Sequence, residues 1–190
     1  MTAFQRAETF AIHDEIGRRK YVSATERGRF LAEADRLAPE WRALCYVLTY
    51  TGCRLSEALG MTAALIDAER LTLTFRTLKR RRLTFRTVHV PRSLIEQLRA
   101  LAPAAGGRLW PMHRATAWRA VKAIMLRAGI SDGPHASPKG LRHGFGIWAA
   151  DRNVPINLLQ RWMGHASPAT TATYVDAVGA EERQFATRMW

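Results

Sequence analysis

A tyrosine and a histidine near the C-terminus have the spacing of two groups that can share one chemical site. Tyr174 follows His165 by nine positions. Gly164 is typical of the residue just past a helix end, and Ser167-Pro168 is a typical start for the next turn or helix. A tyrosine nucleophile must lose a proton whose ordinary pKa is about 10. It also needs a clamp for the charge of a phosphate and a proton donor for the leaving oxygen.

Three basic residues crowd the predicted start of a helix. Ser137 is a good N-cap and Pro138 a good first helical residue. This start places Lys139, Arg142 and His143 at i, i+3 and i+4 on one helix face. Because the helix dipole already makes this end positive, the cluster is unfavourable unless an anion compensates it. A bound phosphate would be such an anion; the alternative is a solvated basic helix start.

An arginine and a glutamate follow a glycine break in an apolar segment. Residues 51–59 read Thr-Gly-Cys-Arg-Leu-Ser-Glu-Ala-Leu, so Gly52 should end one helix and a short second helix should carry Arg54 and Glu57. An exposed ion pair there would be worth only a few tenths of a kcal/mol. The glycine break, the apolar neighbours and an acid able to orient the guanidinium favour Arg54 as a phosphate ligand instead.

Two segments rich in β-formers flank a basic run and predict a β-hairpin. Residues 71–75 alternate as Leu-Thr-Leu-Thr-Phe, and residues 83–90 also carry threonine, phenylalanine and valine. Between them lies the basic run Lys79, Arg80, Arg81 and Arg82. Such a run at a hairpin tip is usually a solvated turn, or it contacts the DNA backbone.

These segments together resemble the tyrosine recombinases, the phage integrase family. Thr-Gly-x-Arg-x-x-Glu at 51–57 is close to the family's first arginine motif, and Arg142-His143 matches the end of its His-x-x-Arg-His pattern. Gly164-His165, a Thr-Thr pair and Tyr174 match its C-terminal signature. The order and approximate spacing imply six catalytic positions: Arg54, Lys79, Lys139, Arg142, His165 and Tyr174.

The resemblance implies phosphoryl transfer without a metal or other cofactor. Arg54 and Arg142 would hold the scissile phosphate, since each guanidinium stays charged and can hold two oxygens. Tyr174 would attack it and form a 3′-phosphotyrosine bond, whose stored energy allows rejoining without ATP. Lys79, the one lysine of the basic run, would protonate the departing 5′ oxygen.

The proton of Tyr174 is expected to leave with help from Lys139 or His165. Lys139 occupies the position where the family pattern has its first histidine, and a lysine must be partly deprotonated before it accepts a proton. Glu57 and His143 are expected to support the site.

The resemblance covers about residues 23–176 and implies the family's mainly helical α+β fold with a small antiparallel sheet. Residues 1–22 are expected to form an N-terminal arm or short helix, and residues 177–190 a C-terminal tail or helix exchanged between protomers. Most members carry a further N-terminal helical domain. We therefore expect either a member built of the catalytic domain alone or a truncated product.

The implied function is site-specific cleavage and rejoining of double-stranded DNA by a recombinase or integrase. The alternative is a catalytically weak or inactive DNA-binding regulator on the same fold. The implied assembly is a homotetramer on DNA, joined through a tail that ends in the apolar residues Phe185, Met189 and Trp190. Accessory DNA-bending proteins are possible further partners.

Composition agrees with a nucleic-acid partner. The 190 residues include 29 Lys and Arg against 16 Asp and Glu, a net charge of +13. An acidic membrane surface is the weaker alternative. Separately, no apolar run approaches the roughly 20 residues of a membrane span. The two cysteines, Cys45 and Cys53, are expected to be buried free thiols of a reduced compartment. We expect a cytoplasmic, nucleoid-associated protein with no zinc site.

The remaining helices are expected to position these groups. Thr25 should cap the first one, and Pro39 should open the second. The second should bury Trp41, Leu44, Cys45, Val47 and Leu48. Pro91 should open a helix after the hairpin. A helix at 116–128 should bury Trp118, Val121, Ile124, Met125 and Leu126.

Overall fold

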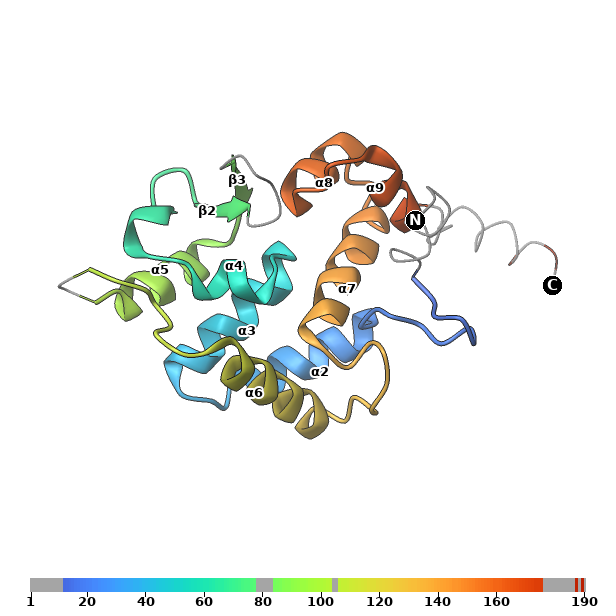
Figure 1. The fold of residues 1–190 in the computed structure, drawn as a ribbon, viewed down its shortest axis with the longest axis horizontal. Coiled ribbons are helices and arrows are strands. Elements are labelled where there is room, and N and C mark those ends of the chain that lie inside the picture. The colour runs from blue at the N-terminus through green and yellow to red at the C-terminus, as the bar shows by residue number, and fades with distance from the viewer. Residues whose placement is uncertain (1–11, 78–83, 104–105, 176–186, 188, 190) are drawn as a thin grey trace.

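The chain forms a helical body with one small sheet, seen in a computed structural model that describes residues 12–77, 84–103, 106–175, 187 and 189 (Figure 1). The expectation of a mainly helical α+β fold is confirmed. In chain order the elements are α2 (Ala24–Ala34), α3 (Pro39–Thr51), α4 (Leu55–Leu59), the 3₁₀ turn η1 (Ala63–Leu65), β1 (Ile66–Asp67), β2 (Thr72–Thr77), β3 (Thr84–His89), α5 (Arg92–Leu101), α6 (Arg114–Arg127), α7 (Pro138–Ala150), α8 (Ile156–Met163) and α9 (Pro168–Val175).

The sheet has the order β1-β2-β3 and is antiparallel throughout. The predicted hairpin is β2 and β3, with Leu73 opposite Val88 and Phe75 opposite Arg86. The two-residue β1 was not predicted, because it is too short to show an alternating pattern. β2 lies against α4, which carries Glu57, and β3 lies against α8, which ends just before His165.

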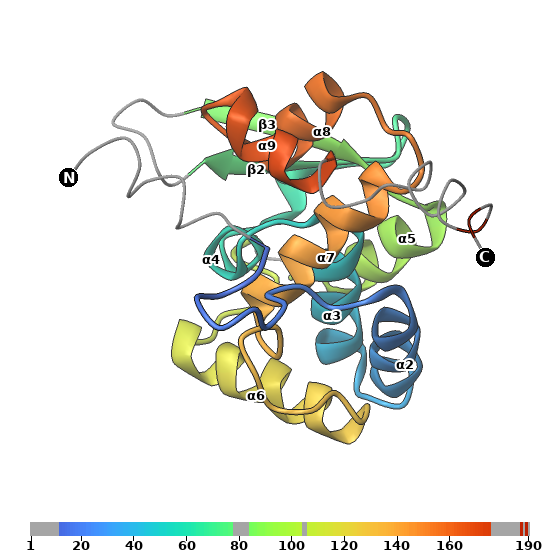
Figure 2. The same cartoon turned by 90° about the vertical axis from the view of Figure 1, so that its right-hand side faces the viewer.

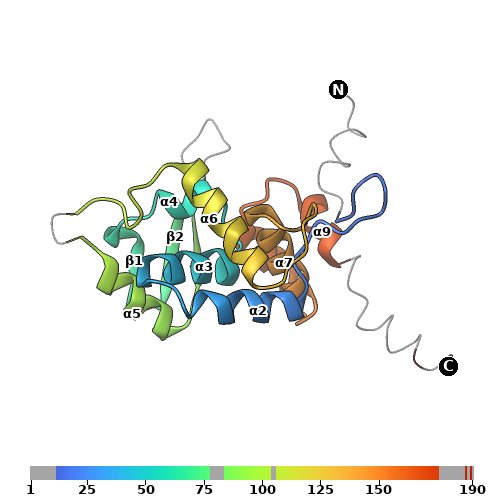
Figure 3. The same ribbon diagram turned by 90° about the horizontal axis from the view of Figure 1, so that it is seen from below.

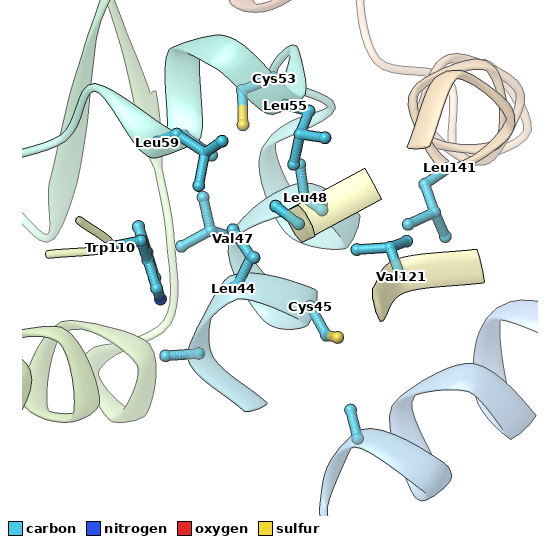
Figure 4. Close-up of a cluster of buried hydrophobic side chains, with 14 of the residues drawn as sticks. Leu44, Cys45, Val47, Leu48, Cys53, Leu55, Leu59, Trp110, Val121 and Leu141 are labelled. Carbon is cyan, nitrogen blue, oxygen red and sulfur yellow. The ribbon is translucent and has the colours of Figure 1, made fainter. Parts of the chain in front are cut away.

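Helix α3 forms the centre of the main apolar core and lies between α5 and α7 (Figure 3). Its first helical residue is Pro39, and Leu44, Cys45, Val47 and Leu48 are at most 1% exposed, as predicted. The exception is Trp41, which is only partly buried. Figure 4 shows these side chains converging with residues of α4, α6 and α7.

Buried Trp110 completes this core from the segment before α6. Its indole Nε1–H donates to the Glu40 carbonyl oxygen at 2.7 Å, which satisfies the polar end of an otherwise apolar anchor. Cys45 and Cys53 are buried free thiols, as expected, and burial raises their pKa values to about 12 and about 11.

A second apolar cluster joins the last three helices. It contains Phe145 and Ala149 from α7, Leu159 and Met163 from α8, and Tyr174 from α9. Figure 2 shows α7 running between the α8–α9 pair and the layer that holds α2, α3 and α6. Helix α7 is therefore shared by both clusters.

Two predicted details of the helices are wrong. Helix α2 is capped by Ser23, not Thr25: the Ser23 hydroxyl accepts the Glu26 N–H at 3.3 Å, and the Glu26 carboxylate accepts the Ser23 N–H at 2.9 Å. Helix α6 starts at Arg114, and the buried positions there are Ala117, Val121, Ile124 and Met125. That stripe leaves Trp118 39% exposed and Leu126 70% exposed, although both were expected in the core.

Residues 12–22 form a loop that is tied to the helical body. Asp14 accepts hydrogen bonds from Arg18, the Val22 N–H donates to Gly140 in α7 at 3.0 Å, and Arg19 pairs with Glu26. No helix in the described ranges is long and apolar enough to cross a bilayer. Within the same ranges, no three His, Cys, Asp or Glu side chains gather as a metal site would require.

Candidate active site

A pocket of about 500 Å³ brings together most of the predicted site residues. Its lining includes six of them: Arg54, Lys139, Arg142, His143, His165 and Tyr174. Glu57 lies behind Arg54 as its hydrogen-bond partner. The remaining predicted residues, Lys79 and Arg80 to Arg82, lie outside the described residues.

Arg54 reaches the pocket because the chain turns sharply just before it. Gly52 ends α3 with φ +58°, and a Cβ there would lie 2.4 Å from Cδ1 of Phe145 in α7. Glycine is therefore required both for the backbone conformation and for the close approach of α7. The Arg54 side chain is 27% exposed, and its Nη1 donates to Oε1 of Glu57 at 2.9 Å. The orientation of Arg54 by Glu57 is confirmed, whereas phosphate binding by Arg54 stays a prediction.

Arg142 links the ends of two helices beneath the pocket. Its Nη1 donates to the Gly52 carbonyl at 2.7 Å and its Nη2 to the Met163 carbonyl at 2.6 Å. These carbonyls stand at the C-terminal ends of α3 and α8, where the helix dipole favours a cation. Burial, and then the positive charge of Arg54, lower the pKa of Arg142 to about 10. An anion bound between the two guanidinium groups would favour their charged forms and oppose this fall in the pKa of Arg142.

The start of α7 has the predicted geometry. Ser137 is the N-cap, its hydroxyl accepting the Gly140 N–H at 3.2 Å, and Pro138 is the first helical residue. Lys139, Arg142 and His143 all line the same pocket. The pocket therefore combines a helix N-terminus with cationic side chains, the arrangement that binds phosphate groups.

Tyr174 is buried in α9, with only 2% of its surface exposed. Its hydroxyl shares a hydrogen bond of 2.8 Å with Nδ1 of His143, and its ring stacks on His165 at a centroid distance of 6.0 Å. A Cβ at Gly146 of α7 would lie 2.8 Å from the tyrosine ring, so only glycine lets the two helices approach this closely. Burial raises the pKa of Tyr174 to about 12, despite the opposing charges of Arg142 and Arg54.

The two histidines beside Tyr174 are neutral near pH 7. Burial first, and then Lys139 and Arg142, lower the pKa of His143 to about 4. Burial first, and then Arg142 and Arg54, lower the pKa of His165 to about 3. Sequence reasoning expected Lys139 or His165 to assist the tyrosine, whereas the structure places His143 on its hydroxyl. The Nδ1 atom of His165 pairs with the Thr171 hydroxyl at 2.9 Å.

Of the other residues that line the pocket, two have charged or aromatic side chains that were not predicted to belong to the site. Arg114, at the start of α6, and Trp118, one turn later, both belong to its lining. The spacing of apolar residues in this helix predicted that Trp118 faces the core, whereas its side chain is exposed at the pocket.

A third unpredicted residue is Arg86, which lies directly behind the pocket. Its guanidinium contacts both oxygens of Glu57 at 3.1 and 2.6 Å. The signal in the sequence was its phase in the strand: Arg86 alternates with Val88 and Val90, which are buried, so an arginine occupies a core-facing position.

Comparison with known proteins agrees with this geometry. The model of the phage integrase family matches residues 20–180. The chain belongs to the phage integrase family. The chain is 34% identical over 169 residues to tyrosine recombinase XerC of Brucella suis biovar 1, covering 82% of the chain and 51% of that protein. The chain thus spans about half the length of that curated relative.

Solved structures of a recombinase and an integrase share the fold. The XerH site-specific recombinase bound to palindromic difH substrate in a post-cleavage complex has a TM-score of 0.75 at 23% identity, over 88% of this chain and 52% of that one. The catalytic domain of bacteriophage HP1 integrase has a TM-score of 0.69 at 23% identity, over 88% of this chain and 93% of that one. The second match extends over nearly the whole of a catalytic domain.

Because His143 and His165 are neutral in the folded chain near pH 7, we predict that its free energy of unfolding falls in mild acid. His143 has a lower pKa in the folded chain than in the unfolded one, about 4 against an ordinary 6.5. The unfolded chain therefore takes up the proton first as the pH falls, and the stability present above pH 6.5 declines toward pH 4. His165 contributes with the same sign.

Urea unfolding at pH 7 and pH 5 measures this effect. From pH 7 to pH 5, the free energy of unfolding should fall about 2 kcal/mol more for the wild type than for His143→Gln. His89→Gln, at an exposed position of β3, should behave as the wild type does. An equal pH dependence in His143→Gln and the wild type would contradict the assignment of a buried neutral His143.

Proposed function

We propose that this chain is the catalytic unit of a site-specific DNA recombinase or integrase that cleaves and rejoins strands through Tyr174. The observation that carries the proposal is one pocket lined by two arginines, a lysine, two histidines and a tyrosine. The similarity to XerC, a named tyrosine recombinase, and to XerH, named with its difH substrate, supports it.

Arg54 and Arg142 would hold the scissile phosphate. Each presents a cationic fork, and Arg142 uses only two of its five N–H donors on backbone carbonyls. Both groups stay charged while negative charge builds on the phosphate oxygens during attack. The N-terminus of α7 would add its dipole to the same anion.

Tyr174 would attack phosphorus while its proton passes to Nδ1 of His143, which lies 2.8 Å from the phenolic oxygen. The new bond joins the phenolic oxygen to phosphorus, and the bond to the 5′ oxygen breaks. Lys79 would give that oxygen its proton. The 3′-phosphotyrosine product keeps the phosphodiester energy, so the reverse reaction rejoins the strand without a cofactor.

Lys139 is better suited to hold the phosphate than to accept a proton. An ammonium group carries donors and no acceptor lone pair. Its place in the first turn of α7 puts its charge at the pocket beside Arg142. His143, on the next turn, supplies the acceptor atom that the family's first histidine position lacks here.

Double-stranded DNA is the proposed substrate, and a net charge of +13 suits a polyanion. We place Arg80, Arg81 and Arg82 on the DNA backbone and the protein with the nucleoid in the cytoplasm. We also propose a homotetramer on DNA, joined through the C-terminal tail, with DNA-bending proteins as accessory partners.

A covalent adduct with DNA tests the proposed chemistry. Wild-type protein, given a randomised library of nicked suicide duplexes in EDTA, should accumulate a protein–DNA adduct, because a nick lets the 5′ fragment diffuse away. Tyr174→Phe should give none. Tyr50→Phe changes a tyrosine of α3 and keeps its ring beside Arg27 of α2, so this variant should match the wild type. Denaturing electrophoresis detects the adduct, and sequencing the attached DNA gives the target site. Salt-sensitive DNA binding without any adduct would instead identify a DNA-binding regulator.

The role of Lys79 can be separated from that of its arginine neighbours. Lys79→Met should slow cleavage about 100-fold or more if the lysine is the proton donor. A substrate with sulfur in place of the 5′ oxygen should restore near wild-type rates, because a thiolate (ordinary pKa about 8.5) leaves without a proton. Arg80→Met should weaken DNA binding and leave the single-turnover rate unchanged. Equal losses on the oxygen and sulfur substrates would exclude Lys79 as the donor.

Deletion of residues 180–190 tests the proposed assembly. The shortened chain should still form an adduct on a single binding site, whereas complexes with two duplexes should be lost in sedimentation velocity. Leu126→Ala removes a large exposed apolar side chain of α6 and should leave assembly unchanged. Undiminished two-duplex complexes after the deletion would rule out the tail as the joining segment.

A further inference from the structure

Arg86 is an arginine buried in a strand, with a side chain only 4% exposed. Burying a guanidinium is costly unless its charge and its donors are compensated. Here Nη1 and Nη2 donate to the two oxygens of Glu57, Nε donates to the Trp162 carbonyl at 2.6 Å, and the group lies over the Phe75 ring at 5.1 Å. Arg86 therefore joins β3 to α4 and to α8.

The Glu57 carboxylate is shared between two arginines. Oε1 accepts from Nη1 of Arg54 and from Nη1 of Arg86, at 2.9 and 3.1 Å. Oε2 accepts from the backbone N–H of Arg54 and from Nη2 of Arg86, at 2.8 and 2.6 Å. Burial on its own would raise the pKa of Glu57, but the hydrogen bonds and charge of Arg86, followed by those of Arg54, lower it overall.

This sharing changes the charge that Arg54 presents to the pocket. Glu57 alone would neutralise Arg54 and compete with a phosphate for its donors. With Arg86 present, two guanidinium groups and one carboxylate leave one net positive charge. Arg54 borders the pocket and Arg86 does not, so this net charge is available where Arg54 is exposed.

The other end of Arg86 meets the turn that carries His165. Trp162 and Met163 are the last two residues of α8, and their carbonyls accept from Arg86 and Arg142 respectively. Gly164 follows with φ +64°, and a Cβ there would lie 3.1 Å from Cδ of Arg86. Arg86 thus fixes the backbone just before His165.

We infer that Arg86 is a positioning residue of the cleavage reaction, acting through Glu57 and the end of α8. It offsets the charge of Glu57, so that Arg54 meets the scissile phosphate as a cation, and it ties this arginine to the turn of His165. The inference rests on the proposed function. Arg86 itself does not contact the phosphate.

Single-turnover cleavage at saturating DNA measures the effect. Arg86→Met should slow cleavage about 100-fold, comparable to loss of one preorganised donor. Arg99→Met, on the exposed face of α5, removes the same charge away from the pocket and should cleave as the wild type does. An Arg86→Met variant as fast as the wild type would overturn the inference.

A substrate with a neutral methylphosphonate at the scissile position separates charge from packing. A neutral phosphate analogue has less need of a cationic Arg54, so the loss caused by Arg86→Met should shrink at least tenfold on it. A merely structural Arg86 would lower both rates equally, and that result would contradict the proposed role.

The double variant Glu57→Gln/Arg86→Met provides a second test, which also serves if Arg86→Met alone does not fold. It removes the buried carboxylate together with its partner and restores one net positive charge around Arg54. It should cleave the ordinary phosphodiester faster than Arg86→Met, because that single variant leaves Glu57 to neutralise Arg54. If Arg86→Met does not fold, the double variant should still lose less than the about 100-fold expected of the single variant relative to the wild type. A double variant as slow as Arg86→Met, or about 100-fold slower than the wild type, would refute the charge-offset mechanism.

Phosphate binding distinguishes failure of this inference from failure of the proposed function. Phosphorus NMR titration with inorganic phosphate needs no cleavage, and Arg86→Met should bind it several-fold more weakly than wild type and Arg99→Met. If the wild type binds phosphate in this pattern but forms no adduct, the recombinase proposal fails and the role of Arg86 in the clamp holds. Equal affinities in Arg86→Met and the wild type would refute that role whether or not the protein cleaves DNA.

Discussion

The site depends on keeping three arginines charged with one carboxylate among them. Glu57 pairs with Arg54 and Arg86, while Arg142 is held by the carbonyls that end α3 and α8. Helix C-termini carry a partial negative charge, so they stabilise a guanidinium without cancelling its charge as a carboxylate would. The protein thus holds cations in a largely buried site, and positive charge remains available for an anion. The sharp turns at Gly52 and Gly164 bring these carbonyls into reach.

Helix α7 links this arrangement to Tyr174. One part of it packs on α3 in the main core, and another packs on α8 and α9 in the smaller cluster. It carries Arg142 and His143 toward the pocket, and Gly146 on the same helix admits the ring of Tyr174. The distance between Arg142 and Tyr174 is therefore set by α7 and its contact with α9.

Local signals in the sequence predicted much of this site. Glycines and N-caps mark helix ends through backbone chemistry, so the breaks at Gly52 and Gly164 and the start of α7 were readable. The burial of individual side chains and their long-range partners could not be predicted from such local signals. Arg86 pairs with residues 29 and 76 positions away, and no local pattern encodes such a contact. The same limit explains the wrong prediction for Trp118. The spacing of apolar residues identifies one face of a helix, but it does not show where a pocket lies along that face.

The burial of the arginine network separates two responses to ionic strength. Salt screens exposed charges over roughly 10 Å at 0.1 M, but it acts far less on pairs withdrawn from solvent. Glu57 and Arg86, with side chains 0% and 4% exposed, belong to the second kind. Added salt would therefore weaken the long-range attraction between this basic protein and a polyanion while leaving the local clamp intact. The long-range attraction and the local arrangement of the site therefore respond differently to salt, and substitutions at different residues can change each of them separately.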